Sequence, residues 1–189
     1  MVVAHEKGLA DELDCVRTVA ITNKPSETLM ADNPLNKIPC LILDDGRELY
    51  DSRVISEYLD CRGGAPSLFP AGAKRWDALR RQALGDGLLD LLIAWRHERN
   101  RPERLRFQSY LDACRTKADA SLDRCRTDTG GRTEFDIGDI AIGCALAYVD
   151  FRYPDLAWRE GREKLADWYS GVAARESFLA TPIIDDGDV

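Results

Sequence analysis

The sequence has no long hydrophobic run and no excess of positive charge. None of its apolar segments approaches the roughly 20 residues that a helix needs to cross a bilayer, and its first residues do not form a signal-peptide pattern. Its 26 lysines and arginines are outnumbered by 33 aspartates and glutamates, which gives a net charge of −7. A basic surface is the usual requirement for binding nucleic acid. We therefore expect a cytoplasmic protein with no membrane partner and no nucleic-acid partner.

The sequence is also poor in metal-ligand patterns. It contains two histidines, His5 and His97, and neither has a second ligand at the spacing of a zinc site. Its six cysteines include no C-x-x-C pair, and a chain of 189 residues can build a core without disulfides. We predict that the protein binds no metal and that its thiols are unpaired.

Glycine and proline gather in one short segment. Residues 62–74, RGGAPSLFPAGAK, contain three of the 14 glycines and two of the eight prolines. This composition is typical of a linker between domains. We therefore predict a first domain at 1–61, a linker at 62–74 and a second domain at 75–189.

The strongest local signal in the first domain lies within residues 33–60. The apolar run 40–43 predicts a buried strand, and Asp44–Gly46 predicts a hairpin turn because glycine readily takes a positive φ. A returning strand then leads to Asp51-Ser52, where a helix is expected to begin with Asp51 as its N-cap. The pattern predicts a strand, a turn, a second strand and a helix.

Three weaker signals precede this segment. Met1–Lys7 predicts a short helix that ends at Gly8, with Leu9 making the apolar contact typical of such an end. The alternating segment Cys15–Ile21 predicts a strand, and 25–33 predicts a short helix. Together they indicate a small mixed unit of strands and helices.

The second domain reads as helical throughout. Apolar residues at helical spacing predict a long helix from Trp76 and a second helix that begins at Pro102. Asp136 and Asp139 have the spacing of a capping box at the start of an almost wholly apolar core helix. A last helix is expected near 161–175, followed by a loose tail from residue 177.

Three segments resemble the glutathione S-transferase family. Asn33–Pro39, NPLNKIP, resembles the family pattern NP-x-G-[KR]-[VI]-P before its third strand, and Asp51-Ser52 resembles its [DE]-S pair. Residues 135–152 resemble the capped core helix of its C-terminal domain. The resemblance covers nearly all of the chain and is nearest to bacterial members of the cytosolic type. It implies an α+β fold, in which a thioredoxin-like N-terminal domain precedes an all-helical C-terminal domain.

The resemblance also implies a glutathione site in the first domain. Ser52, at a helix start, would hold the α-carboxylate of the γ-glutamyl group, because the positive end of the helix lies behind it. Asp51 would pair with the α-ammonium group, cap the helix, or do both. In the family the proline that matches Pro39 is cis, and Ile38 would therefore exchange main-chain hydrogen bonds with the tripeptide.

Lysine side chains are expected at the other end of the tripeptide. Lys37, or less strongly Lys24, would meet the glycine carboxylate of glutathione. Judged by sequence alone, either lysine is a solvated surface charge, since lysine is rarely buried.

The resemblance implies an enzyme of detoxification that adds the thiol of glutathione, its co-substrate, to an electrophilic small molecule. It also implies a homodimer. Two other functions stay open at this point. One is a non-catalytic binding or interaction protein with the same fold, and the other is a glutathione-dependent isomerase, dehalogenase or reductase.

The sequence departs from the family pattern at its N-terminus. Family members begin with a strand and a loop whose Tyr, Ser or Cys hydrogen-bonds the glutathione sulfur, and neither precedes Met1–Lys7 here. The thiol-activating residue is therefore unknown. A start codon placed late would explain this, and we favour that explanation over a true truncation. We expect an incomplete N-terminal sheet, in which Cys15–Ile21 and 40–43 lack a shared neighbouring strand.

Overall fold

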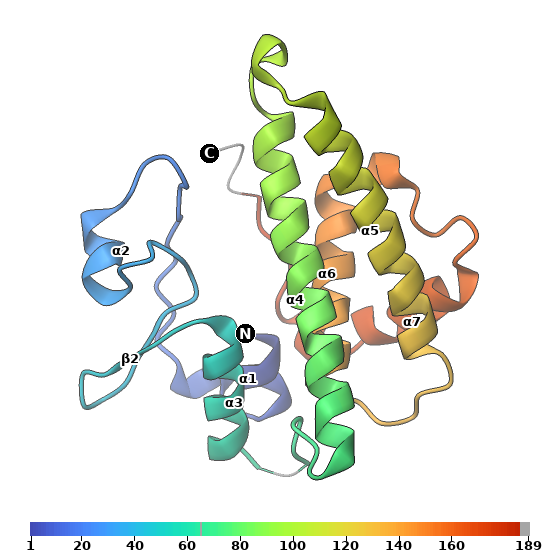
Figure 1. The fold of residues 1–189 in the computed structure, drawn as a ribbon. Coiled ribbons are helices and arrows are strands. Elements are labelled where there is room, and N and C mark those ends of the chain that lie inside the picture. The colour runs from blue at the N-terminus through green and yellow to red at the C-terminus, as the bar shows by residue number, and fades with distance from the viewer. Residues whose placement is uncertain (65, 186–189) are drawn as a thin grey trace. The chain divides into compact units, whose positions relative to one another are not determined.

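The computed structural model describes residues 1–64 and 66–185. The chain forms two compact units: Met1–Ser67, to which Ile184 and Asp185 also belong, and Leu68–Ile183. We call them unit 1 and unit 2. The division falls inside the segment that the sequence predicts to be a linker, and Figure 1 shows the elements of both units.

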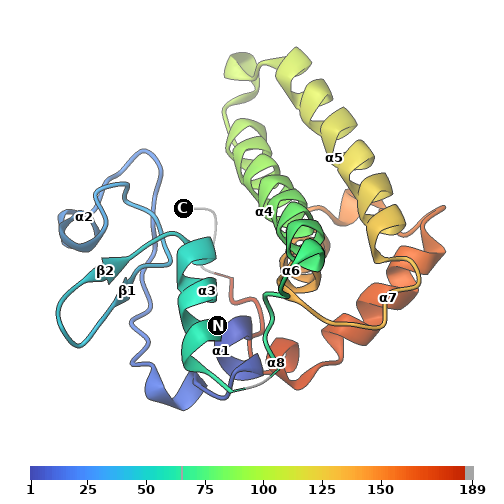
Figure 2. The same cartoon turned by 60° about the horizontal axis from the view of Figure 1, so that its bottom comes forward.

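Unit 1 is a small two-stranded sheet with short helices. Its elements are α1 (Val2–Glu6), the 3-10 turn η1 (Ala10–Glu12), α2 (Glu27–Asp32), β1 (Leu41–Ile42), β2 (Glu48–Leu49) and α3 (Ser52–Arg62). The two strands are antiparallel, with Leu41 opposite Leu49. In both ribbon views α2 lies on one side of this hairpin, and α1 and α3 lie on the other (Figure 1, Figure 2).

The hairpin turn forms as its sequence predicts, but the strand before it, predicted to be buried, is not: β1 spans only Leu41–Ile42, and Ile42 is 54% exposed. Gly46 has a φ of 84°, a backbone conformation that is strained in residues with a side chain. Its N–H donates to the carbonyl of Leu43 at 2.8 Å. The N–H of Leu43 in turn donates to the carbonyl of Arg47 at 2.9 Å. Local turn chemistry is therefore sufficient to set the register of β1 against β2.

Helix α1 ends at a glycine, which confirms the predicted stop. Gly8 has a φ of 68° and donates its N–H to His5 O, while the Leu9 N–H donates to Ala4 O at 2.8 Å. These two bonds form the usual glycine-ended C-terminus, and the side chain of Leu9 is buried beside it.

A buried ion pair holds α1 against α3. Lys7 Nζ lies 3.0 Å from Asp60 Oδ1, and the two side chains are only 2% and 6% exposed. Lys7 also donates to the carbonyl of Pro66 at 2.8 Å, and the Ser67 hydroxyl donates to Asp60 Oδ2 at 2.6 Å. A helix as short as α1 is marginal in water on its own, and docking of this kind stabilises it.

The predicted strand at Cys15–Ile21 is wrong. The segment is extended and largely exposed, and within the described residues the sheet contains only β1 and β2. Ile21 forms an isolated bridge with Lys24, but the segment runs past the hairpin without joining it (Figure 1, Figure 2). Alternation creates a two-faced strand only when a neighbouring strand pairs with it, and none does so here. Unit 1 is thus the incomplete thioredoxin-like domain that the resemblance implies.

Unit 2 is all-helical, as predicted. Its elements are α4 (Ala73–Arg99), η2 (Glu103–Leu105), α5 (Gln108–Thr129), α6 (Ile137–Arg152), η3 (Pro154–Leu156), α7 (Glu163–Ala173) and α8 (Glu176–Leu179). Helix α6 packs against both α4 and α7, and α5 packs against the same two helices. At Gly85 the backbones of α4 and α6 approach so closely that a methyl group there would clash with the backbone of Ala141 and Ile142.

The start of α6 is the predicted capping box, reinforced by a buried arginine. Asp136 Oδ1 accepts from the Gly138 N–H at 2.8 Å, and the Asp136 N–H donates to Asp139 Oδ2 at 3.0 Å. Arg81 of α4, 1% exposed, pairs with both carboxylates. Burial raises the pKa of Asp139, while the neighbouring charge of Arg81 opposes that rise.

Two predicted boundaries in unit 2 are wrong. The helix expected to begin at Pro102 begins at Gln108, because residues 103–105 form the 3-10 turn η2 instead. The tail expected from residue 177 begins later, since Ser177 is buried within the short helix α8. The rest of that predicted tail is described as far as Asp185, and 186–189 lie outside the described residues.

None of the described helices has the length and apolar character to cross a membrane. Nor do the described residues contain a group of three or more His, Cys, Asp or Glu side chains that could hold a metal ion. All six cysteines lie in the described part of the chain and are free thiols there.

Candidate functional site

The hairpin register brings the two predicted glutathione-binding segments together. Leu41 pairs with Leu49 and Ile42 with Glu48 in an antiparallel ladder. The start of one strand and the end of the other lie at the same end of such a ladder. The segment that enters β1, which contains Lys37, Ile38 and Pro39, and the segment that leaves β2 toward Asp51 and Ser52 therefore lie at the same end of the hairpin, although they are separated in sequence.

Asp51 and Ser52 lie at the N-terminus of α3. Asp51 caps the helix, because its Oδ1 accepts from the Arg53 N–H at 3.0 Å. The other carboxylate oxygen of Asp51 and the exposed hydroxyl of Ser52 make no hydrogen bond to any residue that the structure describes. Capping thus uses one oxygen of Asp51 and leaves a second oxygen and a hydroxyl beside the positive end of the helix.

The main chain of Ile38 is also open to a ligand. The Ile38–Pro39 peptide bond is cis, and the Ile38 side chain is 52% exposed. Its N–H and C=O make no hydrogen bond to residues 1–64 or 66–185. The Lys37 side chain is exposed and, within the same residues, is not engaged in an ion pair. Such a segment can pair with an extended peptide through its backbone.

Two asparagines hold this segment, and sequence reasoning did not assign them a role. Asn33, 1% exposed, donates from Nδ2 to the carbonyl of Lys37 at 2.8 Å. Asn36 has a φ of 51° and bridges the Ser26 N–H and the Ile21 carbonyl with its side-chain amide. The signal was present, since asparagine is the residue that most often replaces glycine at a positive φ.

Cys40, which follows Pro39, is an unfavourable thiol for chemistry. Burial raises the pKa of its thiol, and the carboxylates of Asp32 and Glu48 raise that pKa further. Reactive cysteines have lowered pKa values, because the thiolate is the nucleophile. Cys40 therefore stays protonated at neutral pH.

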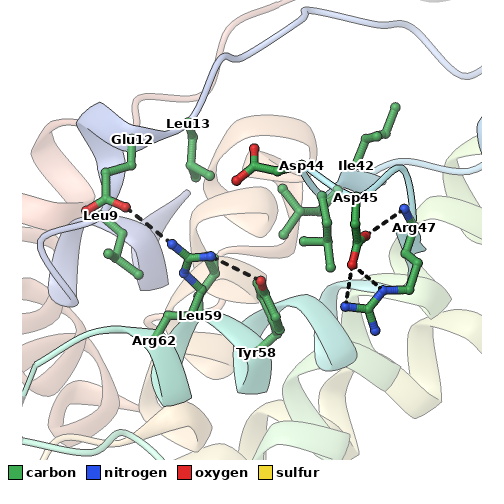
Figure 3. Close-up of a pocket in the computed structure, with 12 residues that line it drawn as sticks. Leu9, Glu12, Leu13, Ile42, Asp44, Asp45, Arg47, Tyr58, Leu59 and Arg62 are labelled. Carbon is green, nitrogen blue, oxygen red and sulfur yellow. Dashed lines mark hydrogen bonds and ion pairs between the residues drawn. The ribbon is translucent and has the colours of Figure 1, made fainter.

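Unit 1 also contains a cavity of about 310 Å³ beside the hairpin (Figure 3). Turn η1, the hairpin and α3 contribute its walls, with apolar side chains from Leu9, Leu13 and Leu59. Figure 3 shows Arg62 between Glu12, 3.8 Å away, and the Tyr58 hydroxyl, 3.3 Å away.

The cavity does not coincide with the predicted site. Lys37, Ile38, Pro39, Asp51 and Ser52 are all absent from its lining. Several of its charged lining residues form ion pairs with one another: Arg47 pairs with Asp45 at 2.7 Å, and Arg62 pairs with Glu12 at 3.8 Å. The structure thus separates this partly open cavity, whose lining is mixed apolar and charged, from the exposed polar groups at the end of the hairpin.

Sequence comparison identifies both halves of the chain. Residues 1–62 match the family model "Glutathione S-transferase, N-terminal domain", and residues 103–171 match "Glutathione S-transferase, C-terminal domain". An Escherichia coli K12 protein described as the uncharacterized GST-like protein YibF is 31% identical over 159 residues, which are 79% of this chain and 76% of YibF.

Solved structures agree with these matches. A glutathione transferase family member from Pseudomonas fluorescens Pf-5, crystallised with bound glutathione, superposes with a TM-score of 0.91 and is 38% identical. The match covers 97% of this chain and 92% of that one. A glutathione S-transferase from Methylobacillus flagellatus KT with glutathione bound gives a TM-score of 0.85 at 35% identity, covering 96% and 92% of the two chains.

Proposed function

Because the chain belongs to the glutathione S-transferase family, we propose that unit 1 binds glutathione at Lys37, Ile38, Pro39, Asp51 and Ser52. The observation that supports this proposal is the antiparallel hairpin, in which the open main chain of Ile38 precedes β1 and the N-terminus of α3 follows β2, at the same end of the ladder. The solved relatives with bound glutathione support the choice of ligand.

Each group has a role that its chemistry suits. The Asp51 carboxylate oxygen that does not cap α3 accepts a hydrogen bond from the α-ammonium of the γ-glutamyl group. The Ser52 hydroxyl donates to the neighbouring α-carboxylate, at the positive end of the helix. The N–H and C=O of Ile38 pair with the cysteinyl part of the tripeptide. Lys37 attracts the glycine carboxylate, and as an exposed charge it contributes the least.

For the reaction, we propose that a cytoplasmic homodimer adds the glutathione thiol to an electrophilic small molecule, with glutathione as co-substrate and detoxification as the purpose. A free thiol has a pKa near 8.5, so that only a few per cent is thiolate at neutral pH. Lowering that pKa costs about 1.4 kcal/mol of differential stabilisation per unit. No residue of this chain is assigned that role.

A second candidate function is glutathione binding without turnover. The raised pKa of Cys40 favours it, because the thiol nearest the site in sequence is not suited to covalent chemistry. Conjugation of a generic electrophile to glutathione by the purified protein, above the rate of a buffer control, would exclude this candidate. Binding without any such turnover would support it.

The site is tested by calorimetric titration with glutathione. Asp51→Asn retains a good N-cap residue but removes the negative charge, so its folding should be nearly unchanged while glutathione affinity falls about 10- to 100-fold. Asp51→Ala with Ser52→Ala should abolish measurable binding. A matched control is Asp14→Ala with Thr28→Ala, which removes one exposed carboxylate and one exposed hydroxyl elsewhere in unit 1. Wild-type affinity in Asp51→Asn would refute the site.

A further inference from the structure

The loop that leads into Pro39 is closed by the buried side chain of Asn33. Asn33 Nδ2 donates to the Lys37 carbonyl at 2.8 Å, while its Oδ1 accepts from the Leu35 N–H at 3.1 Å. The Asn36 N–H donates to the Asn33 carbonyl at 2.9 Å. One residue thus fixes three peptide groups of the loop. The one furthest along the chain contains the Lys37 carbonyl, and the same peptide group carries the Ile38 N–H.

Asn36 ties the same loop to a different part of unit 1. Its Oδ1 accepts from the Ser26 N–H at 2.9 Å, and its Nδ2 donates to the Ile21 carbonyl at 3.3 Å. Ser26 is the N-cap of α2, and its hydroxyl accepts from the Leu29 N–H at 3.3 Å. The loop is therefore anchored to the start of α2 by the side chain of a single residue.

The backbone of Asn36 makes a contribution that is separate from that of its side chain. Its φ of 51° lies in the left-handed region, which glycine adopts freely and asparagine tolerates. The family pattern has glycine here, which allows this backbone conformation but offers no side chain. This chain combines the permitted φ with a two-sided amide bridge, so the two contributions can be separated by substitution.

We propose that Asn33 and Asn36 are positioning residues, which hold Lys37 and Ile38 in the orientation that presents the Ile38 main chain to glutathione. The inference rests on the proposed function, since it assigns residues that act through that site without touching the ligand. A binding segment that is already ordered does not have to be ordered when the ligand arrives, and affinity rises by the entropy saved.

Substitutions at Asn36 test the proposal, because this residue is only half-buried and its substitution leaves no buried cavity. Asn36→Gly keeps the φ and removes the bridge, and we expect glutathione to bind about 3- to 10-fold more weakly. Asn36→Asp keeps the φ and the acceptor for the Ser26 N–H but loses the donor to the Ile21 carbonyl, and it should recover part of the lost affinity. Asn36→Ala loses both contributions and should be the weakest binder of the three.

Affinity is measured by calorimetric titration with glutathione, at a temperature where thermal unfolding shows each variant to be fully folded. A merely structural role would shift the unfolding temperature and leave the affinity of the folded protein unchanged. Asn33→Asp, which loses the donor to the Lys37 carbonyl, is a second variant at an independent contact. Thr28→Ala, at an exposed residue of α2, is the control.

The outcomes separate this inference from the proposed function. Wild-type protein that does not bind glutathione would overturn both. Suppose that the wild-type protein binds glutathione and that the folded Asn36→Gly and Asn36→Ala variants bind it as tightly as the wild type does. This result would overturn the positioning role alone. Weakened binding in these variants, with partial recovery in Asn36→Asp, is the expected result.

Discussion

The two units bury their apolar residues to very different degrees. Unit 2 encloses a continuous core between α4, α5, α6 and α7, in which Leu92, Ile142 and Leu146 are completely buried. Unit 1 has a sheet of two short strands, and it leaves Val16 82% exposed and Ile42 54% exposed. Unit 2 is therefore held by packing between distant helices. Unit 1 has a smaller set of buried apolar residues, among them Leu29, Ile55 and Leu59, and depends in addition on turns, caps, asparagine bridges and the buried ion pair of Lys7 with Asp60.

This difference bears on where binding takes place. The proposed glutathione-binding groups all lie in unit 1, on connecting segments and on the first residue of α3, and their polar groups are open to solvent. Binding groups are commonly carried by connecting segments that a rigid scaffold positions. Within unit 1 that scaffold is a set of discrete polar contacts, so single substitutions should disturb the two units in different ways.

Among the substitutions that break an ion pair, the largest effect is expected in unit 2, at Arg81. Arg81→Met removes the guanidinium that pairs with Asp136 and Asp139 and leaves two buried carboxylates with only part of their compensation. We expect the free energy of unfolding to fall by about 3–5 kcal/mol, measured by denaturant titration. The control is Lys74→Ala, which breaks an exposed pair with Glu134 and should cost under about 1 kcal/mol. Equal effects for the two variants would contradict this account of α6.

A smaller loss is expected in unit 1 from Lys7→Met. The substitution leaves Asp60 buried without its cation, but the Ser67 hydroxyl still donates to that carboxylate. We expect the free energy of unfolding to fall by about 3 kcal/mol, at the low end of the effect of breaking a buried pair. Fluorescence of the four tryptophans, Trp76, Trp95, Trp158 and Trp168, reports unit 2 alone, whereas exchange of the α1 and α3 amides reports unit 1. The comparison predicts accelerated exchange in α1 and α3 with little change in the tryptophan signal.

Alkaline pH should weaken unit 2 through its buried thiols. Burial raises the pKa of Cys125 from 9.0 to about 12 and that of Cys144 to about 11. A raised folded-state pKa gives stability that is full below the unfolded value and is lost as pH rises toward the folded value. Unfolding free energy should therefore fall between about pH 9 and 12. In Cys125→Ala this dependence should be shallower, while Cys15→Ala, at an exposed thiol, should follow the wild type.

The sequence predicted best what local chemistry decides. The turn at Gly46, the cap at Asp51 and the capping box at Asp136 each depend on residues within a few positions of one another. The predicted start of α5, Pro102, differs from the observed start, Gln108, because a proline is compatible with a 3-10 turn as well as with the first turn of an α-helix. Which segments pack or pair with one another in space could not be predicted from a single segment, as the strand wrongly predicted at Cys15–Ile21 shows.

The candidate site shows the same limit. The binding segments were identified by resemblance, and their meeting at one end of the hairpin follows from a register that the turn sets. The bridge from Asn36 to Ser26 and Ile21 joins residues up to 15 positions apart, and no local pattern indicates it. The cavity beside the hairpin likewise has walls from three separate elements.

The smallest effect, and the sharpest test of the comparison, is expected at Val16. This side chain is 82% exposed in the segment Cys15–Ile21, which joins neither β1 nor β2, so Val16→Asp should change the free energy of unfolding by less than about 0.5 kcal/mol. The same change at Val149, completely buried in α6, would place a charge in the core and should prevent folding. Amide exchange adds an independent measurement, since the N–H groups of this segment should exchange far faster than those of α6. A cost of 2 kcal/mol or more for Val16→Asp would mean that the segment is packed in solution, and unit 1 would then have a core that its two-stranded sheet does not provide.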